Sequence, residues 1–299
     1  MLLAAEQLRI DHVTVAGSDL KTMMSNLAAV GLHCEYGGLH RDQVTEMALT
    51  SFPDGSYLEL IAPQQHADPK ALTTHIWAKR MTGNAGPCAW AVGSSDLDGE
   101  VKRLQAAGVT ISPQVRSGRE RPDGKRLEWE MVQVGEEPRG AFFPFVIQDL
   151  SPRHDRVFLS GKPTTKDFGG VSRVVIAVRD LSASAKRYRN AYAFPAPIEQ
   201  VDTGFGAQLA MFTGTPVVLA APLNAGSWLA TRLEQFGEGP CAFILKSRKT
   251  GRFEAATKTR WSMANISWLD TSKLNWHLGF SNDIGTSPRS SRTKTAAVT

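Results

Sequence analysis

The stretch IDHVTVAGSDLKTMMSNLAAVGL, residues 10–32, contains both of the periods that decide the fold. Through residues 12–15, polar and apolar residues alternate, which is the period-two pattern of a β-strand. Through residues 20–30, apolar residues recur every three or four positions, which predicts an amphipathic helix. A serine and Asp19 precede this helix and either can cap it, while Gly31 can end it in the left-handed conformation.

Three further strands are predicted after this helix, at residues 32–36, 45–51 and 56–61. The last two are joined by FPDG, residues 52–55, in which proline, aspartate and glycine favour a tight turn. One unit therefore reads strand, helix and three strands, or βαβββ.

This unit recurs along the chain, and internal repeats decide the architecture. GPCAWAVGSSDLDGEVKRLQAAGV, residues 86–109, matches the first stretch without a gap and aligns its Asp-Leu pair and glycine stop. The strand and the Asp-Leu pair return in VSRVVIAVRDLSASAKRYRNAYAF, residues 171–194, and GPCAFILKS, residues 239–247, repeats the start of the second unit. Later strands are predicted at 109–111, 127–134 and 142–147 in the second unit, and at 207–212 and 216–222 in the third.

The four units predict an α+β fold of two tandem modules, each made of paired βαβββ units. We expect an N-terminal module at residues 1–160 and a C-terminal module at 161–283. Residues 284–299 are rich in Ser, Thr and Ala, which predicts a disordered tail.

Charge and composition argue against several classes of partner. The formal charge is +5, but Arg289, Arg292 and Lys294 in the tail supply three of those charges and leave only +2 for the rest. A surplus this small gives no support for nucleic-acid binding. The chain has no run of about 18 apolar residues that could span a membrane, and no basic leader precedes the apolar N-terminal residues. We expect a globular protein with a cytoplasmic location.

The three cysteines, Cys34, Cys88 and Cys241, are odd in number and far apart. This spacing fits neither a disulfide framework nor a thiolate metal site, so it predicts buried free thiols. The sequence also lacks the glycine loops that hold phosphates and the GxSxG elbow of hydrolases.

With these motifs the chain resembles the vicinal oxygen chelate superfamily and, within it, the glyoxalase-like proteins of the glyoxalase/bleomycin-resistance/dioxygenase fold. The resemblance rests on IDHVTVAGSDL at 10–20, GGLH at 37–40, DGSYLELIAP at 54–63, FFPFVIQDLSPR at 142–153 and SWLDTSKLNWHLGF at 267–280. It implies paired units that curl into a cup of antiparallel strands with helices outside. It also implies a metal at the bottom of the cup, held by the first and last strands of two paired units.

Carried over residue by residue, only the first unit keeps side chains that can bind metal. Its first strand has His12 and its last strand has Glu59. The matching first-strand residues of the other units are Ala89, Arg173 and Ala242, and the matching last-strand residues of units two and three are Phe145 and Val218. The resemblance therefore implies a site in the N-terminal module and a degenerate C-terminal module.

Two chemical interpretations of His12 and Glu59 stay open at this point. They can form part of a site for one divalent iron, manganese, zinc or nickel ion, with His40 as a further donor if the GGLH loop folds over the cup. Alternatively they form a metal-free pair in which the carboxylate orients the imidazole. A purely structural pair is the third alternative.

Aromatic residues of the second unit are candidates for the wall of a ligand pocket. We expect Trp90, Trp129 and Phe145 to contact a substrate together with His40. Alternation along LEWEMV predicts that Trp129 faces the cup and that its two glutamate neighbours face solvent. The basic run RSGRERPDGKR, residues 116–126, predicts a solvated hairpin or a rim that attracts an anionic substrate.

The predicted function is that of a glyoxalase-like lyase or isomerase that acts on a small oxygenated organic molecule. This enzyme is metal-dependent if His12 and Glu59 bind a metal ion. In that function His12 and Glu59 are the catalytic residues. The alternative is a metal-free protein that binds and sequesters an aromatic compound, and extradiol ring cleavage is less favoured because a second first-strand histidine is missing. A scaffold that uses its sheet edges is a third hypothesis, and a homodimer is compatible with the resemblance.

Overall fold

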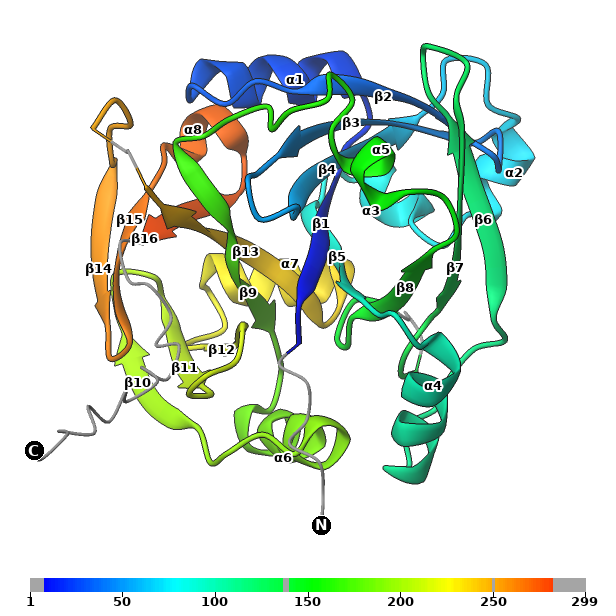
Figure 1. Ribbon diagram of the computed structural model, residues 1–299. Helices are drawn as coiled ribbons and strands as arrows, with labels where there is room; N and C mark the ends of the chain where they lie inside the picture. Colours follow the sequence, from blue (N-terminus) through cyan, green and yellow to red (C-terminus); the bar gives the residue numbers. More distant parts are fainter. Residues whose placement is uncertain (1–7, 137–139, 249–250, 282–299) are drawn as a thin grey trace, which may run out of the picture.

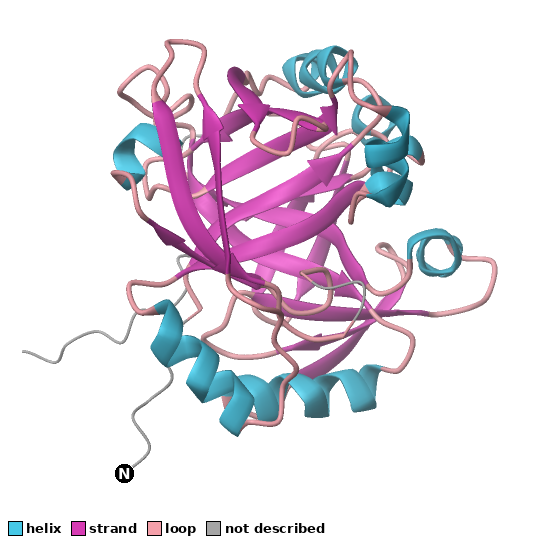
Figure 2. Cartoon of the chain, turned by 90° about the vertical axis from the view of Figure 1, so that its right-hand side faces the viewer, coloured by secondary structure: helices cyan, strands magenta, loops and turns pink. Residues whose placement is uncertain are grey.

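The computed structural model describes residues 8–136, 140–248 and 251–281 of the chain. Its strands form two eight-stranded sheets, one from each part of the sequence (Figure 1). The helices lie around the periphery of these sheets (Figure 2). The predicted α+β fold of two tandem modules is confirmed.

The first sheet is a closed barrel in the order β1-β4-β3-β2-β6-β7-β8-β5. Its strands are β1 (Ile10–Ala16), β2 (Glu35–His40), β3 (Thr45–Ser51), β4 (Tyr57–Pro63), β5 (Gly86–Gly93), β6 (Val115–Glu120), β7 (Arg126–Val132) and β8 (Phe145–Asp149). The helices of this part are α1 (Leu20–Ala29), α2 (Pro69–Thr74), α3 (Ala78–Thr82), α4 (Leu97–Ala106) and α5 (Arg153–Val157). Since β1 pairs in parallel with β4, and β5 with β8, each unit closes by placing its last strand beside its first.

The second sheet has the order β10-β11-β12-β9-β13-β16-β15-β14. Its strands are β9 (Phe168–Ala177), β10 (Ile198–Asp202), β11 (Ala207–Met211), β12 (Val217–Pro222), β13 (Gly239–Ser247), β14 (Thr257–Trp261), β15 (Ala264–Trp268) and β16 (His277–Ser281). The helices here are α6 (Leu181–Tyr192), α7 (Trp228–Phe236) and α8 (Thr271–Leu274). The same parallel pairing of first and last strands recurs, β9 with β12 and β13 with β16.

The recurring Asp-Leu pairs begin helices as predicted. The carboxylates of Asp19, Asp96 and Asp180 accept hydrogen bonds from backbone N–H groups in the first turns of α1, α4 and α6. Gly31 follows α1 with a φ of 84°, which is the left-handed conformation that favours glycine. The fourth unit departs from the repeat, because none of the described residues between β13 and β14 is helical.

Three predicted strands are placed differently by the structure, and the one expected at 142–147 runs from Phe145 to Asp149. The strand expected at 32–36 starts at Glu35 and continues to His40. Residues 109–111 form no strand, and Ile111 makes only an isolated bridge with Val134. Pro113 lacks the N–H group that a longer ladder would need here, so β6 begins two residues later.

The largest core cluster lies between the two modules. Val13 of β1 and Trp90 of β5 belong to it together with Val174 of β9 and Phe243 of β13. The modules thus pack against each other within one chain through the outer face of β1 and β5. Arg232 of α7 reinforces this contact, since its guanidinium donates to the carbonyl oxygens of Ala85 (2.5 Å) and Pro87.

The three cysteines are free, with Cys88 and Cys241 buried and Cys34 half-buried. Burial raises the pKa of Cys34 to about 11 and that of Cys88 to about 12, so these thiols are protonated at neutral pH. Among the described residues, no helix has the length and apolar character needed to cross a membrane. The proposed module boundaries at residues 160 and 283 stay predictions, and residues 284–299 lie outside the described part of the chain.

Candidate functional site

A cavity of about 170 Å³ lies inside the N-terminal barrel. Five residues expected in the site line it, namely His12, His40, Glu59, Trp129 and Phe145. The inward faces of several strands supply its walls, because alternate residues of each strand point into the barrel. The structure therefore brings an imidazole and a carboxylate that are 47 residues apart in the sequence, His12 and Glu59, into one concave chamber.

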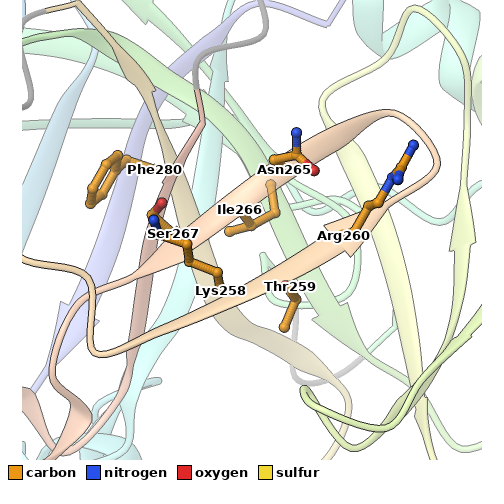
Figure 3. Close-up of a pocket in the computed structure, with 7 residues that line it drawn as sticks. All are labelled: Lys258, Thr259, Arg260, Asn265, Ile266, Ser267 and Phe280. Atoms are coloured by element: carbon orange, nitrogen blue, oxygen red, sulfur yellow. The ribbon is translucent and has the colours of Figure 1, made fainter.

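A larger hollow of about 420 Å³ lies on β14, β15 and β16 of the second sheet (Figure 3). It is lined by Lys258, Arg260, Asn265 and neighbouring residues, with no imidazole or carboxylate among them. In Figure 3 the side chains of Lys258 and Arg260 point in different directions instead of toward one centre. We therefore place the candidate site in the barrel, where groups capable of acid–base chemistry converge.

Trp90 does not line the cavity, contrary to the expectation from sequence. It is fully buried in the core cluster between the modules. The reason is strand alternation: Ala89 and Ala91 point into the barrel, as their cluster with Trp129 and Phe145 shows, so Trp90 between them points outward. Trp129 and Phe145 occupy the expected wall, and Glu128 beside Trp129 pairs with Arg116 at 2.6 Å on the outer surface.

His12 is held by its sequence neighbour Asp11, whose role the sequence did not reveal. Strict alternation would turn Asp11 away from His12, but the register of β1 against β5 shifts between Ile10 and His12. This irregularity lets an oxygen of Asp11 approach His12 Nδ1 to 2.6 Å. Bulges of this kind re-aim side chains next to functional sites. His12 is 4% exposed, and Asp11 is 1% exposed.

Two arginines from α5 neutralise Asp11. Arg156 donates to both oxygens of Asp11, at 3.0 and 2.9 Å, and Arg153 donates to one of them. Arg156 also donates to Asp149, at 2.5 Å, and to the hydroxyl of Tyr57, at 2.6 Å. Burial alone would raise the pKa of Asp11, but the charge of Arg156 and the hydrogen bond with His12 lower it well below its usual range. Asp11 is therefore a permanent carboxylate behind the imidazole.

Two aromatic side chains also hold the ring of His12 in place. Tyr57 of β4 stacks on it, with ring centroids 4.8 Å apart and planes 12° apart. Phe145 of β8 meets it edge-on at 5.3 Å. With the ring held in this way, its Nε2 atom faces Glu59 and lies 3.7 Å from Oε2 of that carboxylate.

Glu59 is 6% exposed and lies between two imidazoles. Its Oε2 accepts a hydrogen bond from Thr14 at 2.9 Å, and its Oε1 lies 3.6 Å from Nε2 of His40. Burial alone would raise the pKa of Glu59, but the hydrogen bond from His40 and the charges that His12 and His40 carry when protonated, together with the Thr14 hydroxyl, lower it to about 2. A carboxylate with so low a pKa is a poor proton acceptor at neutral pH.

His40 reaches this position from a strand and not from a loop over the cup. It ends β2, where it pairs with Arg119 of β6. Gly38 makes the close approach of these strands possible, since its φ is 104° and a Cβ there would lie 2.1 Å from the carbonyl oxygen of Glu120. The GGLH motif thus positions His40 through backbone packing.

Hydrogen-bond partners assign the same tautomer to both imidazoles. Asp11 can only accept, so Nδ1 of His12 donates to it. Thr45 donates its hydroxyl proton to Asp42, at 3.0 Å, and therefore accepts from Nδ1 of His40, at 2.9 Å. In the neutral rings both Nε2 atoms consequently carry lone pairs and face the Glu59 carboxylate. A proton donor placed between these three groups would be strongly stabilised.

The residue types in this cluster suit a metal, but their arrangement does not form a metal site. His12 approaches one oxygen of Glu59 and His40 approaches the other. Within the ranges that the structure describes, no group of three or more His, Cys, Asp or Glu side chains could hold a metal ion. The positions where the second unit would supply ligands have Ala89 and Phe145. His12, Glu59 and the further candidate donor His40 thus do not form a metal site in this geometry.

The described residues of the C-terminal cup form no site equivalent to His12 and Glu59. Its interior is packed with apolar side chains, including Val218 and Ala242 at the positions that match Glu59 and His12. His277 stacks on Trp228 with ring centroids 4.2 Å apart. Burial, followed by the charge of Arg232, lowers the pKa of His277 to about 4, so this imidazole is neutral at neutral pH.

Acid should weaken the barrel through Glu59. The folded-state pKa of about 2 lies below the ordinary value of 4.5, so the stability that this carboxylate contributes is present above pH 4.5 and is lost as the pH falls toward 2. Between pH 6 and pH 3 this loss amounts to about 2 kcal/mol. Urea unfolding at both pH values should show a loss smaller by that amount in Glu59→Gln than in the wild type. Equal losses would contradict the assigned role of Glu59.

The sequence and the structure were compared with known proteins. A family model described as a glyoxalase-like domain matches residues 10–192. Among curated proteins, none matches the sequence. A hypothetical protein from Staphylococcus aureus is similar in structure, with a TM-score of 0.63 and 13% identity over 91% of this chain and 98% of its own.

Two enzymes of known structure share the fold over most of this chain. A mutant of 4-hydroxymandelate synthase from Streptomyces coelicolor has a TM-score of 0.61 and 11% identity, over 93% of this chain and 95% of its own. A xylose isomerase-like TIM barrel/4-hydroxyphenylpyruvate dioxygenase fusion protein has a TM-score of 0.56 and 10% identity, over 95% of this chain and 50% of its own. At these identities the likeness shows the vicinal oxygen chelate fold. The family model covers more than half of the sequence, and the chain therefore belongs to the glyoxalase-like domain family.

Proposed function

We propose that the N-terminal barrel is the active site of a lyase or isomerase that moves a proton on a small oxygenated organic molecule. The observation that supports this most directly is the Asp11–His12 pair, because its carboxylate holds the imidazole with Nε2 free to accept a proton inside the cavity. A histidine oriented in this way by a buried carboxylate is an effective general base.

Each polar group has a separate role in this proposal. His12 takes the proton from the substrate at Nε2, and Asp11 stabilises the positive charge that the ring then acquires. Glu59 stays ionised and stabilises the same charge from the other side, at 3.7 Å. His40, with its own free Nε2, is placed to exchange a proton at the opposite end of the Glu59 carboxylate.

The walls of the cavity suit the apolar part of such a molecule. Trp129, Met131, Phe145 and Ile147 line it on the β7 and β8 side. Small-molecule sites commonly combine apolar walls with a few polar groups that fix orientation. The same walls also favour the second candidate function, a binding protein that sequesters an aromatic compound without chemistry.

Hydrogen exchange into solvent separates these two functions. A panel of small 2-hydroxy and 2-oxo compounds is incubated with the protein in D2O. Loss of the signal from the C–H group next to the carbonyl or carboxyl carbon is followed by proton NMR. We expect catalysed exchange for at least one compound, unchanged in the exposed-histidine control His66→Gln. Saturable binding without any catalysed exchange would favour the sequestration protein.

The same preparation decides the role of a metal. Protein purified without chelators is analysed for iron, manganese, zinc and nickel before and after dialysis against EDTA. Because His12, Glu59 and His40 do not form a metal site in this geometry, we expect exchange to survive the dialysis. A stoichiometric metal whose removal abolishes exchange would overturn the role of His12 as the base and favour the metal-dependent form.

A further inference from the structure

Arg119 is a cation that points into the candidate active site. It lies on β6, and the strand register pairs it with His40 of β2. Side chains of directly paired residues project from the same face of a sheet, about 5 Å apart. Arg119 is 5% exposed and lines the cavity with His40 and Glu59. The basic hairpin predicted to be solvated thus sends one of its arginines inward.

The protein does not provide Arg119 with a paired carboxylate. Its guanidinium donates to the backbone carbonyl oxygens of Gly37 and of Arg156, the latter at 2.7 Å. None of the ion pairs between described residues includes Arg119. The neighbouring Arg153 and Arg156, by contrast, share the two carboxylates of Asp11 and Asp149.

This arrangement prepares the guanidinium for an external anion. Burial lowers the pKa of Arg119 to about 10, which still leaves it charged at neutral pH. A buried charge is costly unless it is paired, so an anionic ligand gains from the charge that is already in place. An arginine has five N–H groups, and the two hydrogen bonds described use two of them. These bonds also hold the planar group in one orientation before a ligand arrives.

We propose that Arg119 binds a carboxylate of the substrate, and that the substrate class is a small 2-hydroxy carboxylic acid with an apolar substituent. A carboxylate matches the planar fork of a guanidinium. The hydroxyl group follows from the neighbours, because the free Nε2 atoms of His12 and His40 and the ionised Glu59 all accept hydrogen bonds and favour an O–H donor between them. The apolar substituent packs on Trp129 and Phe145.

This inference rests on the proposed function only in taking the barrel cavity as the substrate site. It is tested by calorimetric titration with two pairs of compounds, lactate with lactamide and 3-phenyllactate with 3-phenyllactamide, in which an uncharged amide replaces the carboxylate. We expect the wild type to bind each carboxylate about 10- to 100-fold more tightly than its amide, as for a hydrogen bond between charged groups.

Substitutions then assign this preference to Arg119. Arg119→Gln removes the charge and should bring the ratio of the two affinities close to one, and Arg119→Lys, which keeps the charge but not the fork, should give an intermediate ratio. Arg116→Gln is the matched control on the outer face of the same strand and should keep the wild-type ratio. Melting curves check that each variant folds, and if Arg119→Gln does not, the wild type and Arg119→Lys still decide the outcome.

Two results would overturn the inference: equal affinities of the wild type for acid and amide, or a wild-type ratio retained in folded Arg119→Gln. Failure of the proposed function looks different. His12→Gln should abolish proton exchange and keep the preference for the carboxylate, whereas a wild type that binds carboxylates but catalyses no exchange would leave Arg119 as the anion-binding residue of a binding protein.

Discussion

Asp11→Asn should lower the rate of proton exchange on the order of 10⁴-fold, although Asp11 does not line the cavity. The carboxylate accepts from Nδ1 of His12 at 2.6 Å and so keeps Nε2 unprotonated. An asparagine can turn its NH2 group toward Nδ1, which then becomes the acceptor and moves the ring proton to Nε2. In that tautomer His12 cannot take a proton from the substrate. The variant also loses the negative charge that stabilises the protonated ring.

The measurement is the exchange rate by NMR, with Asp98→Asn on the exposed side of α4 as the control. Asp11 also pairs with Arg156, so the rates are compared at a temperature where circular dichroism shows every variant folded. His12→Gln should lose about as much activity, and the double variant Asp11→Asn with His12→Gln should lose no more than either alone, because residues that act as a unit are not additive. A loss below tenfold in folded Asp11→Asn would remove Asp11 from the mechanism.

Arg156→Met should destabilise the fold by about 3–5 kcal/mol, since it leaves a buried carboxylate without its main partner. Arg156 is 2% exposed and donates to Asp11, Asp149 and Tyr57 at the same time. Methionine fills similar space but supplies neither charge nor hydrogen bonds. The free energy of unfolding in urea measures this loss.

Arg116→Met provides the comparison, because Arg116 forms an ion pair with Glu128 on the surface and such pairs contribute at most about 1 kcal/mol. The double variant Arg156→Met with Asp11→Asn should be less destabilised than the sum of the two single variants, since the unpaired charge is then gone. Additive losses would show that Arg156 does not stabilise the fold through Asp11.

The sequence was sufficient for the strand and helix that open the first three units and for the repeat. Period-two and helical patterns, together with the Asp-Leu starts and the glycine stops, predicted β1, α1 and their counterparts in later units. These features are local, because a cap or a hydrophobic period depends on residues within a few positions of one another. The same patterns placed His12 on a first strand and Glu59 on a last strand.

The orientation of Trp90 could also be predicted from the sequence, provided that strand alternation is applied to every residue of the strand. Matching Ala89 to His12 already implies that Trp90 faces away from the cup, as the structure shows. Alternation fails at Asp11, where a register shift turns two consecutive residues toward each other. No pattern in one sequence distinguishes these two cases, because the shift depends on how β1 pairs with β5.

The amino-acid order by itself determined the fourfold repeat, most strands of the first three units, the helices that begin at Asp-Leu pairs, and which unit carries an imidazole and a carboxylate. Only the tertiary structure decided what surrounds them: Arg156 lies 145 positions after Asp11, and Arg119 lies 79 positions after His40. Barrel closure sets these neighbours, since strand register and the docking of α5 join residues whose separation along the chain carries no periodic signal. Barrel closure therefore places Asp11 and Arg156 behind His12, and it places Arg119 where it can bind a ligand.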